Sequence, residues 1–199
     1  MSYIGKTPTA VPLTSSDITD NIITSAKIVD GAIATADIAD GAVTSVKTTG
    51  VGGTNTPSFF AVSTSSEDGN NVPDNTLTKM TFSTEVYDTN SNYASSRFTP
   101  TTAGKFFIFT KAMADNVVAN AQTKLEFYKN GSQMDDQYRM RVRTGGSPIG
   151  DIEQTLILSA IIDMNGSGDY IEVYAAHNNG GNTGGLFDKF FGAYKLIGV

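Results

Sequence analysis

The chain of 199 residues contains no cysteine, which excludes disulfide bonds and thiolate metal sites as the means of stabilising its fold. Such a fold must depend on packing and assembly. The chain is also short of positive charge, with a formal net charge of −6, whereas a nucleic-acid partner requires a basic face. We therefore expect no nucleic-acid partner and no attraction to an anionic membrane surface.

Long apolar runs are missing as well. The longest, Leu156–Ile162, is far shorter than a membrane span. The first residues, Met1–Pro8, have neither the basic region nor the apolar region of a secretory signal. We expect no membrane insertion and no secretory route.

Histidine occurs once, at His177, near the end of a predicted strand. A Ser-His-Asp catalytic unit could therefore be built around one residue only. The adjacent acids Asp135 and Asp136 fall on a polar loop, where such neighbours usually point into water and do not form a glycosidase pair. We expect a protein that is not an enzyme and that has no cofactor.

A calcium loop is the one metal site that the sequence suggests. Asp163–Asp169 has oxygen-bearing side chains at alternate positions and a glycine at the sixth. The twelfth position, which should hold a bidentate acid, is Tyr174. We assign no metal here, and the other interpretation of the segment is a turn between two strands.

The segment from Asp17 to Val46 has an unusual period, because an aliphatic residue occupies every fifth position. On an α-helix a step of five rotates by about 140°, so these side chains would scatter around the axis. On a flat strand an odd step sends successive side chains to opposite faces. The backbone is therefore predicted to turn with the period. The aliphatic residues are Ile18, Ile23, Ile28, Ile33, Ile38 and Val43.

A longer repeat of ten residues lies over this pattern. Ser25–Ala34 is echoed by Thr35–Thr44, so Asp30-Gly31 and Asp40-Gly41 fall at the same phase. A turn residue followed by a residue with positive φ belongs at such a position. The segment is therefore a repeat array.

This array cannot bury its aliphatic residues alone. Six of them, at roughly 1.5–3 kcal/mol each when fully buried, do not offset about 1–2 kcal/mol of backbone entropy for each ordered residue. A single-chain coil of pentads would be too short to stack several layers. Three parallel copies could meet along a common axis, which predicts a trimeric stalk over residues 17–47. The alternative is a disordered linker of low complexity.

Two segments of different composition flank the array. Residues 1–16 are predicted to form an extended arm, which is either a frayed terminus or an anchor that docks on a larger body. The glycines and closing proline of residues 48–57 predict a hinge. The apolar residues of the arm, which would carry the anchoring, are Tyr3, Ile4, Val11 and Leu13.

Residues 58–199 have the composition of an all-β domain, because short β-branched or aromatic runs alternate with clusters of Asn, Gly, Asp and Ser. Nine or ten such strands predict an antiparallel double-layer sandwich of the jelly-roll kind. The expected strands are Phe59–Ser63, Thr78–Phe82, Tyr93–Phe98, Lys105–Met113, Lys124–Lys129, Tyr138–Arg143, Thr155–Ile162, Tyr170–Ala176 and Lys189–Ile197.

Four motifs follow one another in this domain: Phe98–Phe109, Leu125–Gly131, Gly168–Val173 and Phe190–Ile197. In this order they resemble the landmarks of the tumour-necrosis-factor-like jelly roll, in the branch typified by the globular heads of complement. The resemblance implies a jelly roll of about ten strands that assembles as a tight trimer, frequently on a repetitive trimeric stalk. A collagen stalk is not expected, because the chain has no Gly-x-y run.

The combination of arm, array and C-terminal jelly roll, opening with Met1–Gly5, is similar to fibre proteins of tailed bacteriophages. That resemblance implies a virion appendage, on the tail or on the capsid or neck, that touches the host surface. The arm would then bind another structural protein of the virion.

Three arginines at a spacing of two, Arg139, Arg141 and Arg143, are predicted to share one face of a strand, with Met140 and Val142 on the other. They form an ordinary solvated face, or pair with acids of a neighbouring subunit, or make a cationic strip for anionic sugars or phosphates.

Loops at the far end of the jelly roll are the expected recognition surface, because a rigid sandwich displays them. The amide-rich segment Asn178–Phe187 and the loop Asp115–Gln122 are the candidates. The receptor-binding residues proposed beside the arginines are His177, Asn178, Asn179, Asn182 and Phe187.

Phe190, Phe191 and Tyr194 are expected in the sandwich core and along the trimer axis, where aromatic area contributes most. The whole pattern predicts a homotrimeric phage fibre protein whose head binds a host surface glycan or protein. A capsid or neck decoration fibre, or a fibre adaptor with a purely structural role, would have the same sequence features.

Overall fold

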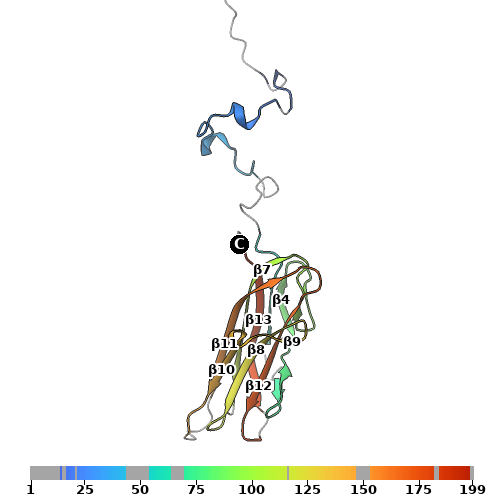
Figure 1. Cartoon of the computed structure of the whole chain (residues 1–199), viewed down its shortest axis with the longest axis vertical. Coiled ribbons are helices and arrows are strands. Elements are labelled where there is room, and N and C mark those ends of the chain that lie inside the picture. The colour runs from blue at the N-terminus through green and yellow to red at the C-terminus, as the bar shows by residue number, and fades with distance from the viewer. Residues whose placement is uncertain are drawn as a thin grey trace, which may run out of the picture. The chain divides into compact units, whose positions relative to one another are not determined.

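The computed structural model describes residues 14, 17–20, 22–43, 54–63, 70–115, 117–146, 153–181 and 184–197. These residues divide into two compact units, with the boundary between Thr49 and Gly50 (Figure 1). Each unit is described by itself. The anchoring residues predicted from the sequence, Tyr3, Ile4, Val11 and Leu13, lie outside the described residues.

In the N-terminal unit the backbone turns once in every five residues. The amides of Asp17, Ile22, Lys27, Ala32, Asp37 and Ala42 each donate to the carbonyl three residues earlier. Two of these turns are the short 3-10 helices η2 (Ser25–Lys27) and η3 (Thr35–Asp37), ten residues apart, and Gly31 and Gly41 both have a φ of 77°. Pentad and decad periods are therefore both present in the backbone.

The aliphatic residues of the array stay partly exposed within their own chain. Ile18, Ile23, Ile28, Ile33, Ile38 and Val43 have between 40% and 54% of their surface accessible. No residue of the two 3-10 helices is buried. The turns are thus held by local hydrogen bonds, while the side chains that define the period leave much apolar surface uncovered.

The C-terminal unit contains two antiparallel sheets. Sheet A has the strand order β11-β7-β13-β1-β4, and β2 also pairs with β13. Its strands are β1 (Ser58–Ser63), β2 (Asn70–Val72), β4 (Thr84–Asp88), β7 (Gly104–Ala114), β11 (Gln154–Met164) and β13 (Gly184–Lys195).

Sheet B has the strand order β10-β8-β12-β6-β5, with β3 paired to β12 and β9 paired to β8. Its strands are β3 (Thr78–Lys79), β5 (Tyr93–Ala94), β6 (Arg97–Phe98), β8 (Gln122–Lys129), β9 (Ser132–Gln133), β10 (Arg139–Arg143) and β12 (Ile171–Asn178). A third 3-10 helix, η6 (Asp136–Tyr138), leads into β10.

The chain passes from one sheet to the other at most connections. In chain order the principal strands are β1, β6, β7, β8, β10, β11, β12 and β13, and they belong to sheets A, B, A, B, B, A, B and A. This double-layer arrangement is a jelly roll, so the all-β fold class expected from the sequence is confirmed. In the described residues helical structure is limited to short 3-10 turns, and no helix there could cross a membrane.

A single apolar core lies between the sheets. β7 illustrates how it forms, because its side chains alternate along the strand and Phe106 and Ile108 are fully buried. Phe59 stacks on Tyr93 and Phe98, with ring centroids 4.6 and 4.7 Å apart, and so joins strands of both sheets. The core fixes which side of each strand faces outward.

The strand predictions differ from the structure mainly at short or polar edges. The sequence did not predict β2 or β4. β2 is only three residues long, and the first four residues of β4, at the edge of sheet A, are exposed and so lack an alternating apolar pattern. The predicted strand Tyr93–Phe98 is broken at Ser95 and Ser96, which both have positive φ. Asn130-Gly131, a residue pair typical of hairpin turns, joins β8 to β9, with Lys129 opposite Ser132.

Candidate functional site

The outer side of sheet A carries a cluster of aromatic and aliphatic side chains beside the charged residues Lys105, Lys111 and Asp163, although the inner side already forms the core. Because strand residues alternate, Phe107 and Phe109 point away from the core on β7, and Phe190 and Tyr194 do so on β13. We call this surface the apolar face. Its members are Phe60, Phe107, Phe109, Phe190, Tyr194, Ile157 and Ile161.

Phe109 is at the centre of the apolar face. Its ring centroid lies 5.7 Å from that of Phe107, 6.2 Å from Phe60 and 6.0 Å from Phe190. At the edge strand β11, Ile157 and Ile161 are 60% and 55% exposed. Antiparallel sheets usually turn a polar side to water, and large exposed apolar patches mark interaction sites. The apolar face is therefore a candidate protein contact surface.

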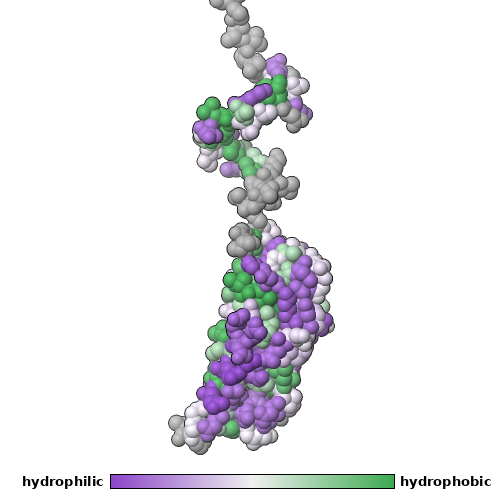
Figure 2. Space-filling model, in the orientation of Figure 1, coloured by the Kyte–Doolittle hydropathy of each residue, from purple (hydrophilic) through white to green (hydrophobic). Residues whose placement is uncertain are grey.

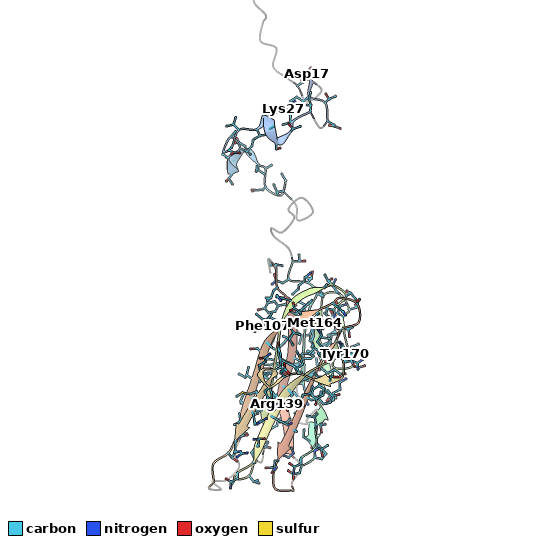
Figure 3. All side chains as sticks on the ribbon, viewed as in Figure 1. Asp17, Lys27, Phe107, Arg139, Met164 and Tyr170 are labelled. Carbon is cyan, nitrogen blue, oxygen red and sulfur yellow. The ribbon has the colours of Figure 1, made fainter. Side chains whose placement is uncertain are left out.

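The viewed side of the head shows both kinds of surface. Figure 2 shows hydrophilic residues over much of this side and apolar residues gathered toward one edge. In Figure 3 the label of Phe107 lies toward that edge, whereas Arg139 lies in the hydrophilic region.

Gly192 lets the aromatic rings lie flat on the apolar face. A Cβ at this position would lie 2.5 Å from Cζ of Phe109 and 3.0 Å from Cδ2 of Phe60. We expect Gly192→Ala to displace both rings, at a cost of roughly 1–3 kcal/mol for each copy of the site. If the face is an assembly surface, sedimentation velocity should show weaker self-association of a folded variant. Unchanged association would contradict the contact role.

The outer side of sheet B carries all four arginines of the chain. Arg139, Arg141 and Arg143 alternate on β10 with Met140 and Val142, which pack against the core, as the sequence predicted. Arg97 of β6 lies on the same outer side. We call this surface the arginine face. Its charged members are Lys79, Arg97, Lys124, Glu126, Arg139, Arg141, Arg143 and Glu172.

Two buried glutamates hold four of these cations. Oε1 of Glu126 lies 2.7 Å from Nζ of Lys124 and 2.8 Å from Nε of Arg139. Oε1 of Glu172 lies 2.6 Å from Nζ of Lys79 and 2.9 Å from Nη2 of Arg97. The two glutamates are only 1% and 3% exposed.

The environment of Glu172 keeps it ionised. Burial alone would raise its pKa, but the hydrogen bonds from Lys79 and Arg97 outweigh burial, and the net shift of the pKa is downward. Tyr128 and Tyr174 lie between the two ion-pair groups, with their ring centroids 4.2 Å apart. This part of the arginine face is therefore a network in which two carboxylates pair with four cations.

Arg141 and Arg143 differ from the other arginines. Both are exposed, and no ion pair joins either one to a carboxylate of the described residues. The strand register places Arg141 opposite Lys124 and Arg143 opposite Gln122. Their charge is available to a ligand or a partner.

A pocket of about 250 Å³ opens over β8 and β12, next to the strand that carries these two arginines. It is lined by Asn75, Leu77, Gln122, Lys124, Ala176, His177 and Asn178. Gln122 and Lys124 come from β8, Ala176 and Asn178 from β12, and the pairing of Asn178 with Gln122 brings the two strands together here. The pocket therefore combines amide groups with one ammonium group.

The other receptor candidates from the sequence have different positions. His177 is 6% exposed, and its Nε2 accepts a hydrogen bond of 2.9 Å from the Gly184 amide and contacts the Val72 carbonyl. Asn179 is 1% exposed, and its Oδ1 accepts a hydrogen bond from the Val118 amide. These side chains hold the end of the sandwich together.

Of the remaining candidates, Asn178 joins the arginine face, while Phe187 lies on the outer side of sheet A, opposite Met113. Asn182 lies outside the described residues. The expected loop Asn178–Phe187 is shorter than predicted, because β12 extends through Asn178 and β13 begins at Gly184.

The three aromatic residues expected in the core and along an axis are divided between two environments. Phe191 is fully buried, with its ring centroid 4.9 Å from that of Phe59. Phe190 and Tyr194 are half-buried and belong to the apolar face. Only Phe191 is part of the sandwich core.

The candidate calcium loop is occupied by internal hydrogen bonds. Oδ1 of Asp169 accepts from Nδ2 of Asn130 at 2.8 Å, and Oδ2 accepts from the Asn165 amide at 2.9 Å. Lys129 Nζ lies 2.9 Å from Oδ2. The hydrogen bonds from Asn130 and Lys129 lower the pKa of Asp169 to about 2. The described residues contain no group of three acidic or histidine side chains suited to a metal ion.

These contacts predict a pH dependence. The folded-state pKa of about 2 lies below the usual aspartate value of 3.8, so the carboxylate stabilises the head above about pH 4 and loses this contribution as the pH falls toward 2. The shift corresponds to roughly 2 kcal/mol. In urea unfolding, Asp169→Asn should be less stable than wild type by this amount at pH 7 and should match it near pH 2. A difference that does not change with pH would contradict the assignment.

No protein-family model and no curated protein matches the sequence. Similar solved structures include two crystal structures of murine APRIL, at pH 5.0 and pH 8.5. They are 12% and 13% identical to this chain, with TM-scores of 0.48 and 0.47, and 70% of this chain and 98% of that chain are covered. Identity this low does not extend to function, and the jelly-roll assignment follows from the strand order itself.

Proposed function

We propose that the protein is a non-enzymatic, homotrimeric fibre of a phage particle. The N-terminal arm attaches to another virion protein, the pentad array forms a stalk, and the jelly-roll head binds a glycan on the host surface. Three heads on one fibre would act together, so that weak single sites give strong overall binding.

The apolar face carries this proposal. In a monomer the ring cluster centred on Phe109 is only partly buried, and Ile157 and Ile161 beside it are both more than half exposed. Two further copies of the same chain are the occupants that we assign to it. A homo-oligomer with closed symmetry covers the same patch on every copy, and no other partner is needed.

The array supports the same number of copies on independent grounds. Its six aliphatic residues stay at least 40% exposed although the backbone turns with their period. Three parallel copies would cover these side chains along one axis. A trimer would therefore cover the exposed apolar residues of both units.

Binding of the full chain to bacterial cells tests the proposed function. Fluorescently labelled protein should bind host cells saturably, and unlabelled protein should compete with it. A capsid or neck decoration fibre, or a structural adaptor, should give no saturable binding, and that result would overturn the attachment role. Electron microscopy of particles with antibody bound to the head should show the antibody at the free tip of a fibre.

A further inference from the structure

The arginine face carries an inference about the ligand, which rests on the proposed function of the head. We propose that the pocket beside Arg141 and Arg143 binds an acidic polysaccharide. The two guanidinium groups would pair with carboxylate or sulfate groups of the polymer, and the amide side chains of the pocket would bind its hydroxyl groups.

Unmatched positive charge is the first support. The arginine face contains six cations, and its two glutamates, Glu126 and Glu172, neutralise only part of that charge. Asp136 pairs with Arg139 at 2.8 Å, but its side chain is 89% exposed, so water screens its charge. Arg141 and Arg143 keep their full charge in a chain whose net charge is −6. An anion is therefore attracted to this surface in preference to the rest of the protein.

The position of the two arginines is the second support. Side chains directly opposite each other on paired strands lie about 4.5–5.5 Å apart at their Cβ atoms. Arg141 is paired with Lys124 and Arg143 with Gln122, and Lys124 and Gln122 line the pocket, so the two arginines lie one strand away from it on the same side of sheet B. Asn75 and Leu77 border it on another side. A polymer that occupies the pocket and extends across β8 onto β10 would thus meet Lys124 first and then the two arginines.

The lining of the pocket is suited to a sugar. Asn75, Gln122 and Asn178 each offer an amide donor and an amide acceptor, which matches the paired hydroxyl groups of a carbohydrate. Ala176 and Leu77 provide a small apolar surface for the carbon-bound face of a ring. The volume of about 250 Å³ is small beside pockets for drug-sized ligands, at about 300–1,000 Å³, and fits a sugar-sized unit.

The same lining disfavours nucleic acid, the other common polyanion. Proteins that bind single strands stack bases on exposed aromatic side chains. The lining residues of this pocket include no Phe or Tyr, and the nearby Tyr128 and Tyr174 rings pack on each other. Backbone binding to a duplex also requires many cations, whereas Arg141, Arg143 and Lys124 are three.

Titration of the full chain with defined polysaccharides tests the inference. The probes are polygalacturonate, which carries carboxylates, dextran sulfate, which carries sulfates, and neutral dextran of equal length, in about 0.15 M salt, where charges more than about 8 Å apart are screened. At least one acidic probe should bind, with an affinity that falls as salt is raised, and neutral dextran should not. The two acidic probes distinguish carboxylate recognition from sulfate recognition.

Four arginine variants and one control identify the groups responsible. Arg141→Gln and Arg143→Gln should each weaken binding of the acidic probe about tenfold, the typical loss for one charge-assisted contact. The double change to lysine keeps the charge but loses the two-pronged geometry, so it should weaken binding less than the double change to glutamine. Lys105→Gln is the matched control, because it removes one exposed cation from sheet A and should leave binding unchanged. Thermal unfolding of each variant should match wild type.

Some results would overturn the inference and leave the proposed function standing. One such result has two parts. The wild type and the double glutamine variant both bind cells saturably, and the wild type binds neither acidic probe. Another is an affinity for single-stranded DNA that equals the affinity for the acidic polysaccharide and that falls by the same factor in the arginine variants. Conversely, tight binding of an acidic probe by a protein that does not bind cells would support the pocket and overturn the attachment role.

Discussion

Phe109→Glu is expected to convert the proposed trimer into folded monomers. Phe109 contacts four other aromatic rings on the apolar face, and none of these contacts is part of the core between the sheets. A carboxylate there can remain in water in a monomer, but it would have to be buried in a trimer. Each of the three copies of residue 109 should lose at least about 2 kcal/mol of binding free energy. The free energy of association should therefore weaken by roughly 6 kcal/mol, or about 10⁴-fold in the association constant.

Two further variants make this prediction specific. Gln133→Glu adds the same charge at an exposed position of β9 and should leave the trimer intact. Phe191→Glu places the charge in the core, where Phe191 is fully buried, and should prevent folding. Circular dichroism separates an unfolded chain from a folded monomer, and analytical ultracentrifugation gives the mass. A trimeric Phe109→Glu protein would contradict the assignment of the apolar face.

The second large effect is expected in the array. Replacing Ile28, Ile33 and Ile38 together with serine should open the stalk while the head stays folded. Each isoleucine is 40–53% exposed in a single chain, so about 1 kcal/mol per side chain remains to be gained by assembly. For nine side chains in a trimer the loss is roughly 9 kcal/mol.

Limited proteolysis measures this effect directly. The wild-type array should resist cleavage and the triple variant should be cut within residues 17–47, leaving an intact head. Val29→Ser is the matched control, because Val29 is 76% exposed and lies outside the five-residue phase. Equal cleavage of the wild type and the triple variant would favour the disordered linker that the low-complexity composition also allowed.

The sequence allowed a good prediction of features that depend on local periodicity. The alternation of Arg139, Arg141 and Arg143 with Met140 and Val142 follows from the two-residue period of a strand. The hairpin at Asn130-Gly131 follows from residues that tolerate positive φ, which are 54° and 77° here. The turns of the array follow from a period that neither a helix nor a flat strand accommodates.

Features that depend on which strands become neighbours could not be predicted in this way. The run Phe106–Phe109 is apolar on both sides of β7, and the sequence does not show which side faces the core. The same holds for Phe190 and Tyr194, which belong to the outer side of sheet A. The pocket joins Leu77, Lys124 and Ala176 from three distant segments, and their meeting depends on the pairing of β8 with β12.

His177 shows a different limit. A lone histidine before an amide-rich segment suggested an accessible loop, but the extension of β12 through Asn178 places its side chain inside the sandwich. Boundaries of strands are set by pairing partners, here Thr123 of β8 opposite His177, more than by the residues at the strand end. A candidate chosen for its residue type therefore became part of the structural framework.

The mass of the purified full chain in solution tests the central claim most directly. Light scattering coupled to size exclusion should give about 63 kDa, three times the 21.0 kDa of one chain, at micromolar concentration. A well-folded species of 21.0 kDa, with the array present, would contradict the account of both the apolar face and the stalk.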